Sequence, residues 1–76
     1  MFNQNIIGER LKALRKEKGI SQTALGNVLG ITKASISDLE HGRQSTTLEN
    51  LYILAQYLDT TSDYLLGLSD VRERKS

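Results

Sequence analysis

Residues 21–40 (SQTALGNVLGITKASISDLE) constrain the fold of this chain most, because they fit two short helices separated by a tight turn. Ser21 can accept a hydrogen bond from a free backbone N–H group in the first turn of the first helix. The apolar residues that follow recur at helical spacing on one face: Leu25, Val28 and Leu29. This first helix is therefore predicted to end near Leu29.

Three residues make up the predicted turn. Gly30 can take a positive φ at no steric cost and can therefore end the first helix. Ile31 is apolar enough to be buried in the turn, and Thr32 can cap a second helix that runs from Lys33 to about His41. A helix, a short turn containing glycine and a second helix form the helix-turn-helix motif.

The second helix of this motif has an apolar and a polar face. Ile36 and Leu39 are three residues apart and are predicted to be buried. The opposite face is polar and has little bulk: Lys33, Ala34, Ser37, Asp38 and His41. Small side chains let a helix approach a solid surface closely, and the major groove of DNA, about 12 Å wide, admits such a helix. The stretch therefore predicts DNA binding through residues 33–41.

The chain has 76 residues and no cysteine. This length permits one small domain, whose stability comes from packing rather than from disulfides or thiolate metal sites. No apolar run approaches the roughly 20 residues that cross a bilayer, and the first five residues lack the pattern of a signal peptide. We therefore expect a cytoplasmic protein that does not bind membranes.

The net charge of +1 favours no partner by itself, but the charges are unevenly distributed. Residues 1–45 hold seven Lys and Arg against four Asp and Glu, whereas residues 46–70 hold four acids and no base. The front of the chain is therefore basic and its back acidic. Phosphates are expected to meet the basic front.

A further helix is predicted before the motif. It is capped by Asn3 or Asn5 and reaches Lys18, and Gly19 stops it. Its apolar residues share one face: Ile7, Leu11 and Leu14. Most of its charged residues are expected to be solvated surface: Glu9, Arg10, Lys12, Lys16, Glu17 and Lys18.

Gly42 is predicted to end the second helix of the motif, and two more helices are predicted after it. Thr46 and Glu49 have the spacing of a capping box, and apolar residues follow at helical spacing: Leu48, Leu51, Tyr52, Ala55 and Leu58. Residues 60–62 can cap a last short helix over residues 63–66. The chain is therefore predicted to be all-α, with five helices and no strand in a compact domain over residues 1–70. Residues 71–76 form a charged tail that is expected to be flexible.

Gly26 lies inside the first helix of the motif, where glycine costs roughly 1 kcal/mol relative to alanine. One interpretation is that the helices of the motif approach too closely there for a methyl group. The other is that the position merely tolerates a weak helix former.

No set of residues suggests catalysis. His41 is the single histidine, and one histidine without any cysteine cannot assemble a zinc site. The serines and aspartates around His41 do not have an arrangement that suggests a catalytic triad. We expect His41 to be a solvated residue near the helix end that can also touch a phosphate. The chain is predicted not to be an enzyme and to have no cofactor, metal or small-molecule ligand.

The sequence of this chain resembles the Cro/CI-type helix-turn-helix regulators of phages and bacteria, also called the Xre family. The resemblance covers about residues 6–67. The residues that carry it are Arg10, Leu11, Leu14, Arg15, Gly19, Ile20, Ser21, Gln22, Leu25, Leu29, Gly30, Ile31, Ile36, Ser37, Glu40, Gly42, Leu51, Leu54, Ala55, Leu58 and residues 63–67. The run Ala24, Leu25, Gly26 is similar to lambdoid phage repressors. A proline common after the second helix of the motif is absent near Ser45 and Thr46, and no long amide side chain occupies positions 33, 34 or 38.

The resemblance implies a lambda-repressor-like fold and a set of DNA contacts. Base edges would be contacted by Lys33, Ala34, Ser37 and Asp38. Lys33 can donate to guanine, Ala34 can touch a thymine methyl group, and Asp38 can accept from cytosine N4, or else point aside and repel wrong sequences. Phosphates would be bound by Gln22, Thr32, Ser35, Arg43, Gln44, Ser45 and Thr47; for Gln22 the alternative is an ordinary surface residue.

The resemblance also implies that Arg15 pairs with Glu40. Glu40 follows apolar Leu39, where a lone carboxylate would be poorly solvated, and a guanidinium solves that problem.

Two classes of function remain open. The first is a DNA-binding regulator, a repressor that reads an inverted repeat as a homodimer, with Tyr57, Leu68 and Val71 as candidate dimer contacts. The second is an antitoxin-like or other protein-interaction module of the same fold that binds DNA only with a partner.

Overall fold

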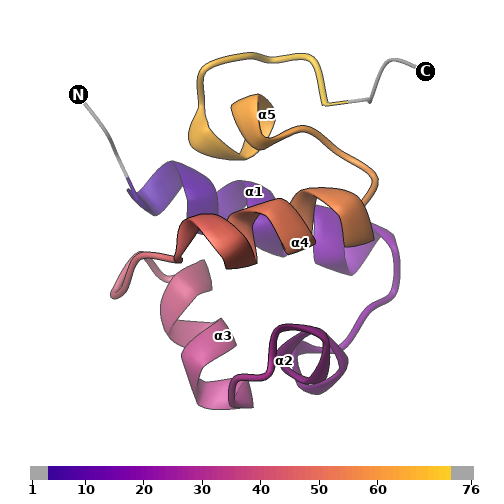
Figure 1. The fold of residues 1–76 in the computed structure, drawn as a ribbon, viewed down its shortest axis with the longest axis vertical. Helices are drawn as coiled ribbons and strands as arrows, with labels where there is room; N and C mark the ends of the chain where they lie inside the picture. The colour runs from indigo at the N-terminus through magenta and orange to yellow at the C-terminus, as the bar shows by residue number, and fades with distance from the viewer. Residues whose placement is uncertain (1–3, 73–76) are drawn as a thin grey trace.

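The structure, a computed structural model, describes residues 4–72, and these form five α-helices and no strand (Figure 1). The helices are α1 (Gln4–Glu17), α2 (Gln22–Leu29), α3 (Lys33–Glu40), α4 (Leu48–Tyr57) and α5 (Ser62–Leu66). The predicted all-α class with five helices is confirmed. Asn3, one of the two predicted caps of the first helix, lies outside the described residues, and Asn5 lies inside α1.

Helices α2 and α3, which form the motif, lie at one end of the molecule, and α5 lies at the other (Figure 1). α1 packs against both α3 and α5, and α4 packs against α5 and α2. The core that they enclose consists almost entirely of leucine and isoleucine: Leu11, Leu14, Leu25, Leu29, Ile36, Leu39, Leu51, Leu54, Ala55, Leu58 and Leu65. α1 and α4 therefore form the body that supports α2 and α3.

Four helices begin with a hydroxyl cap. Ser21, Thr32, Thr47 and Thr61 each accept a hydrogen bond from the backbone N–H group three residues later, at 3.0 or 3.1 Å. Gly30 has φ +71° and ends α2, as predicted. Ile31 in the turn packs against the core, also as predicted.

The predicted capping box is wrong. The cap of α4 is Thr47, whose hydroxyl accepts from Asn50 N, so that Thr46 lies one residue before the cap and Glu49 is not at the third helical position. The predicted ends of α1 and α3 are each one residue too late, because α1 ends at Glu17 and His41 is the C-terminal cap of α3.

Three residues that the sequence pattern groups with the apolar positions of their helices are exposed. Leu48 and Tyr52 of α4 are 86% and 63% exposed, and Val28 of α2 is 37% exposed. The buried face of α4 is centred on Leu51, Leu54 and Leu58. At 100° per residue, Leu48 and Tyr52 lie roughly 90° and 130° from the centre of that face, so α4 presents a second apolar stripe to solvent.

Gly26 lies at a close approach that leaves no room for a methyl group, as in the first of the two interpretations, but its neighbour is the turn and not the second helix of the motif. A Cβ atom at this position would lie 2.7 Å from the carbonyl oxygen of Ile31, which is backbone and belongs to the turn of the motif.

Gly26→Ala is therefore expected to lower the stability by about 1 kcal/mol, because the cost of overpacking exceeds the gain of roughly 1 kcal/mol in helix propensity. Thermal unfolding followed by circular dichroism measures the change. A higher Tm in the variant would support a merely tolerated glycine.

Arg10 is not the solvated residue that the sequence predicts. Its guanidinium donates to the carbonyl oxygens of Tyr64 and Ser69 at 2.7 and 2.8 Å, contacts Asp70 at 3.1 Å and lies 4.2 Å from the centre of the Tyr64 ring. These contacts attach the segment after α5 to α1. Two further contacts reach the start of the predicted tail, because buried Thr60 donates to the carbonyl oxygen of Arg72, and Arg72 pairs with Glu17 at 2.6 Å.

Candidate nucleic-acid interface

The outer face of α3 carries the four residues predicted to contact base edges. Lys33 and Ala34 are exposed, and Ser37 and Asp38 are partly exposed. Ile36 and Leu39, on the opposite face of the same helix, are 0% and 2% exposed. The core therefore fixes which side of α3 is available to a ligand, and that side is the one predicted from the sequence. Contact of these residues with DNA remains a prediction.

Thr32 and Ser35 stabilise the beginning of α3. The Thr32 hydroxyl oxygen accepts from Ser35 N at 3.1 Å and donates to the Ser35 hydroxyl oxygen at 3.1 Å. Both side chains lie at the positive end of the helix, where backbone N–H groups favour an anion. The predicted phosphate contacts of these two residues are compatible with this capping role and remain predictions.

Asp38 and Arg43 form an ion pair on this surface. Arg43 Nη1 lies 3.0 Å from Asp38 Oδ1, and the side chains are 62% and 40% exposed, respectively. The end of α3 brings them together, because Gly42 has φ +73° and lets Arg43 N bond the carbonyl oxygen of Asp38 at 2.8 Å. This is the Schellman arrangement that commonly ends helices. Two residues predicted to contact different parts of DNA are thus in contact with each other.

The loop after α3 is held by α1. Gln4 Nε2 donates to the carbonyl oxygen of Gly42 at 2.5 Å, and the Ser45 hydroxyl donates to Gln4 Oε1 at 2.6 Å. Gln44 is exposed, and Thr47 caps α4. Sequence reasoning missed Gln4, because no local pattern connects residues that lie about 40 positions apart. The predicted phosphate contacts of Gln44, Ser45 and Thr47 stay predictions.

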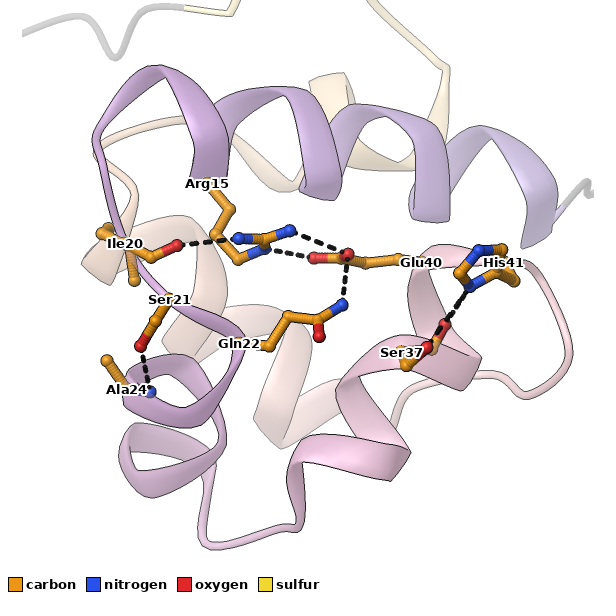
Figure 2. Close-up of polar contacts among 8 residues, drawn as sticks. All are labelled: Arg15, Ile20, Ser21, Gln22, Ala24, Ser37, Glu40 and His41. Carbon is orange, nitrogen blue, oxygen red and sulfur yellow. Dashed lines mark hydrogen bonds and ion pairs between the residues drawn. The ribbon is translucent and has the colours of Figure 1, made fainter.

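The Arg15–Glu40 pair implied by the resemblance is present, and it is bidentate. Arg15 Nε and Nη2 lie 2.5 and 3.1 Å from the two carboxylate oxygens of Glu40, whose side chain is 0% exposed. Arg15 Nη1 also donates to the carbonyl oxygen of Ile20 at 2.9 Å. Figure 2 shows Arg15 from α1 and Gln22 from α2 converging on Glu40. The network joins α1, α2 and α3.

Gln22 belongs to this network. Its side-chain nitrogen donates to Glu40 Oε1 at 3.0 Å and the residue is only half-buried. One of its two N–H groups is therefore engaged, which leaves the other and the amide oxygen for a ligand. The predicted phosphate contact of Gln22 is compatible with this geometry and remains a prediction.

His41 lies at the end of α3, where its ring nitrogen Nδ1 is 2.7 Å from the carbonyl oxygen of Ser37 (Figure 2). The residue is exposed. Across residues 4–72, no group of three or more His, Cys, Asp or Glu side chains is placed to hold a metal ion. None of the helices over the same residues is long and apolar enough to cross a membrane.

An α2–turn–α3 unit whose inner face is buried and whose outer face is polar, supported by three further helices, defines a helix-turn-helix domain. The chain belongs to the HTH_3 family of helix-turn-helix domains, whose sequence model matches residues 11–65. The resemblance to Cro/CI-type (Xre family) regulators predicted from the sequence is thereby confirmed.

Repressor protein C2 of Salmonella phage P22 is 39% identical over 65 residues, which are 86% of this chain and 30% of that protein. The Bacillus subtilis regulator AnsR is 42% identical over 59 residues, which are 78% of this chain and 51% of AnsR. The chain thus spans about a third to a half of the length of these relatives.

Two solved complexes have the same fold. The P22 c2 repressor in complex with synthetic operator 9T has a TM-score of 0.77 at 38% identity, covering 83% of this chain and 96% of that one. SinR, a master regulator of biofilm formation solved in complex with DNA, has a TM-score of 0.70 at 34% identity and covers 79% of this chain and 97% of that one.

Proposed function

We propose that this protein is a sequence-specific transcriptional regulator, a repressor, that inserts α3 into the major groove of an inverted-repeat operator as a homodimer. The observation that carries the proposal is the outer face of α3, where exposed Lys33 and Ala34 lie opposite fully buried Ile36. A helix whose outward side chains are mostly short, and whose inner face is held by the core, fits the groove closely. The resemblance to the P22 c2 repressor and to SinR, both solved in complex with DNA, supports the same role.

The proposed dimer would use the apolar residues predicted from the sequence. Tyr57, Leu68 and Val71 are 43%, 75% and 58% exposed. The Thr61 hydroxyl donates to the carbonyl oxygen of Val71 at 3.5 Å, which brings the segment after α5 back to the connection that follows Tyr57. A contiguous apolar surface there would suit a second copy of the chain. A regulator of this kind acts on DNA in the cytoplasm and has no need of catalysis, a cofactor or a membrane.

The decisive test compares the same substitution at two exposed alanines. Ala34→Glu places bulk and negative charge on the outer face of α3 and is expected to weaken binding to DNA at least tenfold. Ala13→Glu, on the exposed side of α1, makes the same charge change and is expected to leave binding within about twofold. Fluorescence anisotropy with labelled DNA selected from a random pool measures both. Equal loss in the two variants would contradict the proposed role of α3.

Salt dependence and site symmetry test the remaining parts. If the dimer neutralises six or more phosphates, its affinity should fall by about a thousandfold between 50 and 200 mM salt. The selected sequences should contain an inverted repeat whose half-sites are about one helical turn apart. A single unrepeated site would contradict the dimer. No binding even at low salt would favour a module that needs a partner.

A further inference from the structure

The ion pair between Asp38 and Arg43 occupies the surface that the proposed function assigns to DNA. Asp38 lies on the outer face of α3, and Arg43 is the first residue after the glycine that ends this helix. The contact joins one nitrogen, Nη1, to one oxygen, Oδ1, at 3.0 Å. Both the backbone bond from Arg43 N to the Asp38 carbonyl oxygen and the side-chain pair fix Arg43 beside the last turns of α3.

A carboxylate on this face is electrostatically unfavourable without a partner. It would approach two phosphate chains, and most groups on the base edges of the major groove are acceptors that a carboxylate cannot bond: guanine O6 and N7, adenine N7 and thymine O4. Exocyclic amino groups are the donors there, and cytosine presents its N4 amino group without an adjacent acceptor on the same base. Asp38 can therefore gain only from a narrow choice of base.

The geometry of the pair removes part of this difficulty. Arg43 has five N–H donors, and Asp38 engages one of them. The remaining donors can bind a phosphate in the bidentate manner that guanidinium groups favour. Arg43 can thus neutralise Asp38 and bind a DNA phosphate at the same time. The second carboxylate oxygen of Asp38 remains available to a base.

We propose that Arg43 is a positioning residue, which orients Asp38 toward a cytosine amino group so that the pair selects a C·G base pair in each half-site. This inference rests on the proposed function and adds to it a base pair that the regulator selects. It assigns Arg43 more than a phosphate contact, since removing its side chain should change which sequences are bound and not only how tightly.

Two simpler roles lead to different results. If the pair were an ordinary surface ion pair, neither variant would alter base preference, because such pairs contribute little. If Arg43 bound only a phosphate, Arg43→Ala would weaken binding to all sequences alike and lower the salt slope by about one.

The experiment selects DNA from a random pool with four proteins: the wild type, Asp38→Asn, Arg43→Ala and the double variant. The affinity of each protein is then measured for the preferred site and for sites with single-base substitutions. Lys16→Ala, which also removes one positive charge but lies on the exposed side of α1, is the control. Asp38→Asn and Arg43→Ala should both lose roughly tenfold of the discrimination at one and the same base pair. The double variant should lose no more discrimination than either single variant, and Lys16→Ala should keep the wild-type base preference.

The outcomes separate this inference from the function on which it rests. If the wild type selects a sequence and Arg43→Ala keeps every base preference while binding more weakly, the coupling of Arg43 to Asp38 is overturned and the regulator stands. If Asp38→Asn keeps the preference, Asp38 does not select a base. A wild-type protein that selects no sequence would overturn the proposed function and the inference together. Circular dichroism of each variant confirms that the fold is unchanged.

Discussion

Arg15→Ala is expected to destabilise the protein by about 3–5 kcal/mol, the usual cost of leaving one member of a buried ion pair alone. The Glu40 side chain is 0% exposed and, among residues 4–72, would keep only the hydrogen bond from Gln22. The carbonyl oxygen of Ile20 would also lose its donor. Domains of this size are stable by roughly 4–11 kcal/mol, so the variant should be near the limit of folding. Urea unfolding followed by circular dichroism measures the loss.

The adjacent residue supplies the control. Lys16 is exposed on the same helix, and Lys16→Ala should change the stability by less than about 0.5 kcal/mol. A double variant, Arg15→Met with Glu40→Leu, should recover much of the lost stability, because replacing both charges leaves none buried without a partner. Equal unfolding curves for Arg15→Ala and Lys16→Ala would show that the pair contributes nothing.

Gly8→Ala is expected to destabilise by about 2 kcal/mol, although alanine is the better helix former by roughly 1 kcal/mol. A Cβ atom on Gly8 would lie 2.4 Å from the carbonyl oxygen of Leu39 and 2.5 Å from that of Glu40. Both atoms are backbone of the last turn of α3, so α1 and α3 would have to separate. That separation would also stretch the Arg15–Glu40 pair.

The measurement is again the free energy of unfolding, with Glu9→Ala on the exposed side of α1 as control. The loss at Gly8 should exceed the loss at Gly26, where one backbone oxygen rather than two lies within 3 Å of the added atom. A variant that is more stable than the wild type would mean that α1 and α3 can shift apart without cost.

Local chemistry made the motif predictable from the sequence. Ser21, Gly30 and Thr32 act through hydrogen bonds and dihedral angles within three residues, and Ile36 and Leu39 identify the buried side of α3 by spacing alone. The outer face that forms the candidate site follows from that side. These features need no knowledge of how the helices cross.

The errors arose where two local signals competed. α4 has apolar residues on more than one side, so its spacing could not reveal that Leu48 and Tyr52 face solvent. Neighbouring Thr46 and Thr47 are equally good caps, and the one with a glutamate three residues later was not the one used. Packing of α4 against its neighbours decides both cases.

The contacts that were missed depend on distant residues. The Gln4 side chain holds the loop after α3, Gly8 permits the crossing of α1 with α3, and Arg10 holds the segment after α5. Each depends on the angle between helices, which no short pattern encodes. The Asp38–Arg43 pair was missed for a different reason, because both residues were assigned separately to DNA although the helix end places them together.

The engagement of Glu40 by α1 and α2 has a consequence for association. α3 is already preorganised when it meets its ligand, since Arg15 and Gln22 set its orientation during folding. The conformational entropy of ordering this helix is therefore lost once, in the free protein. We therefore expect docking to be nearly a rigid-body event, in which contacts with the ligand contribute to affinity without first offsetting a disorder-to-order transition.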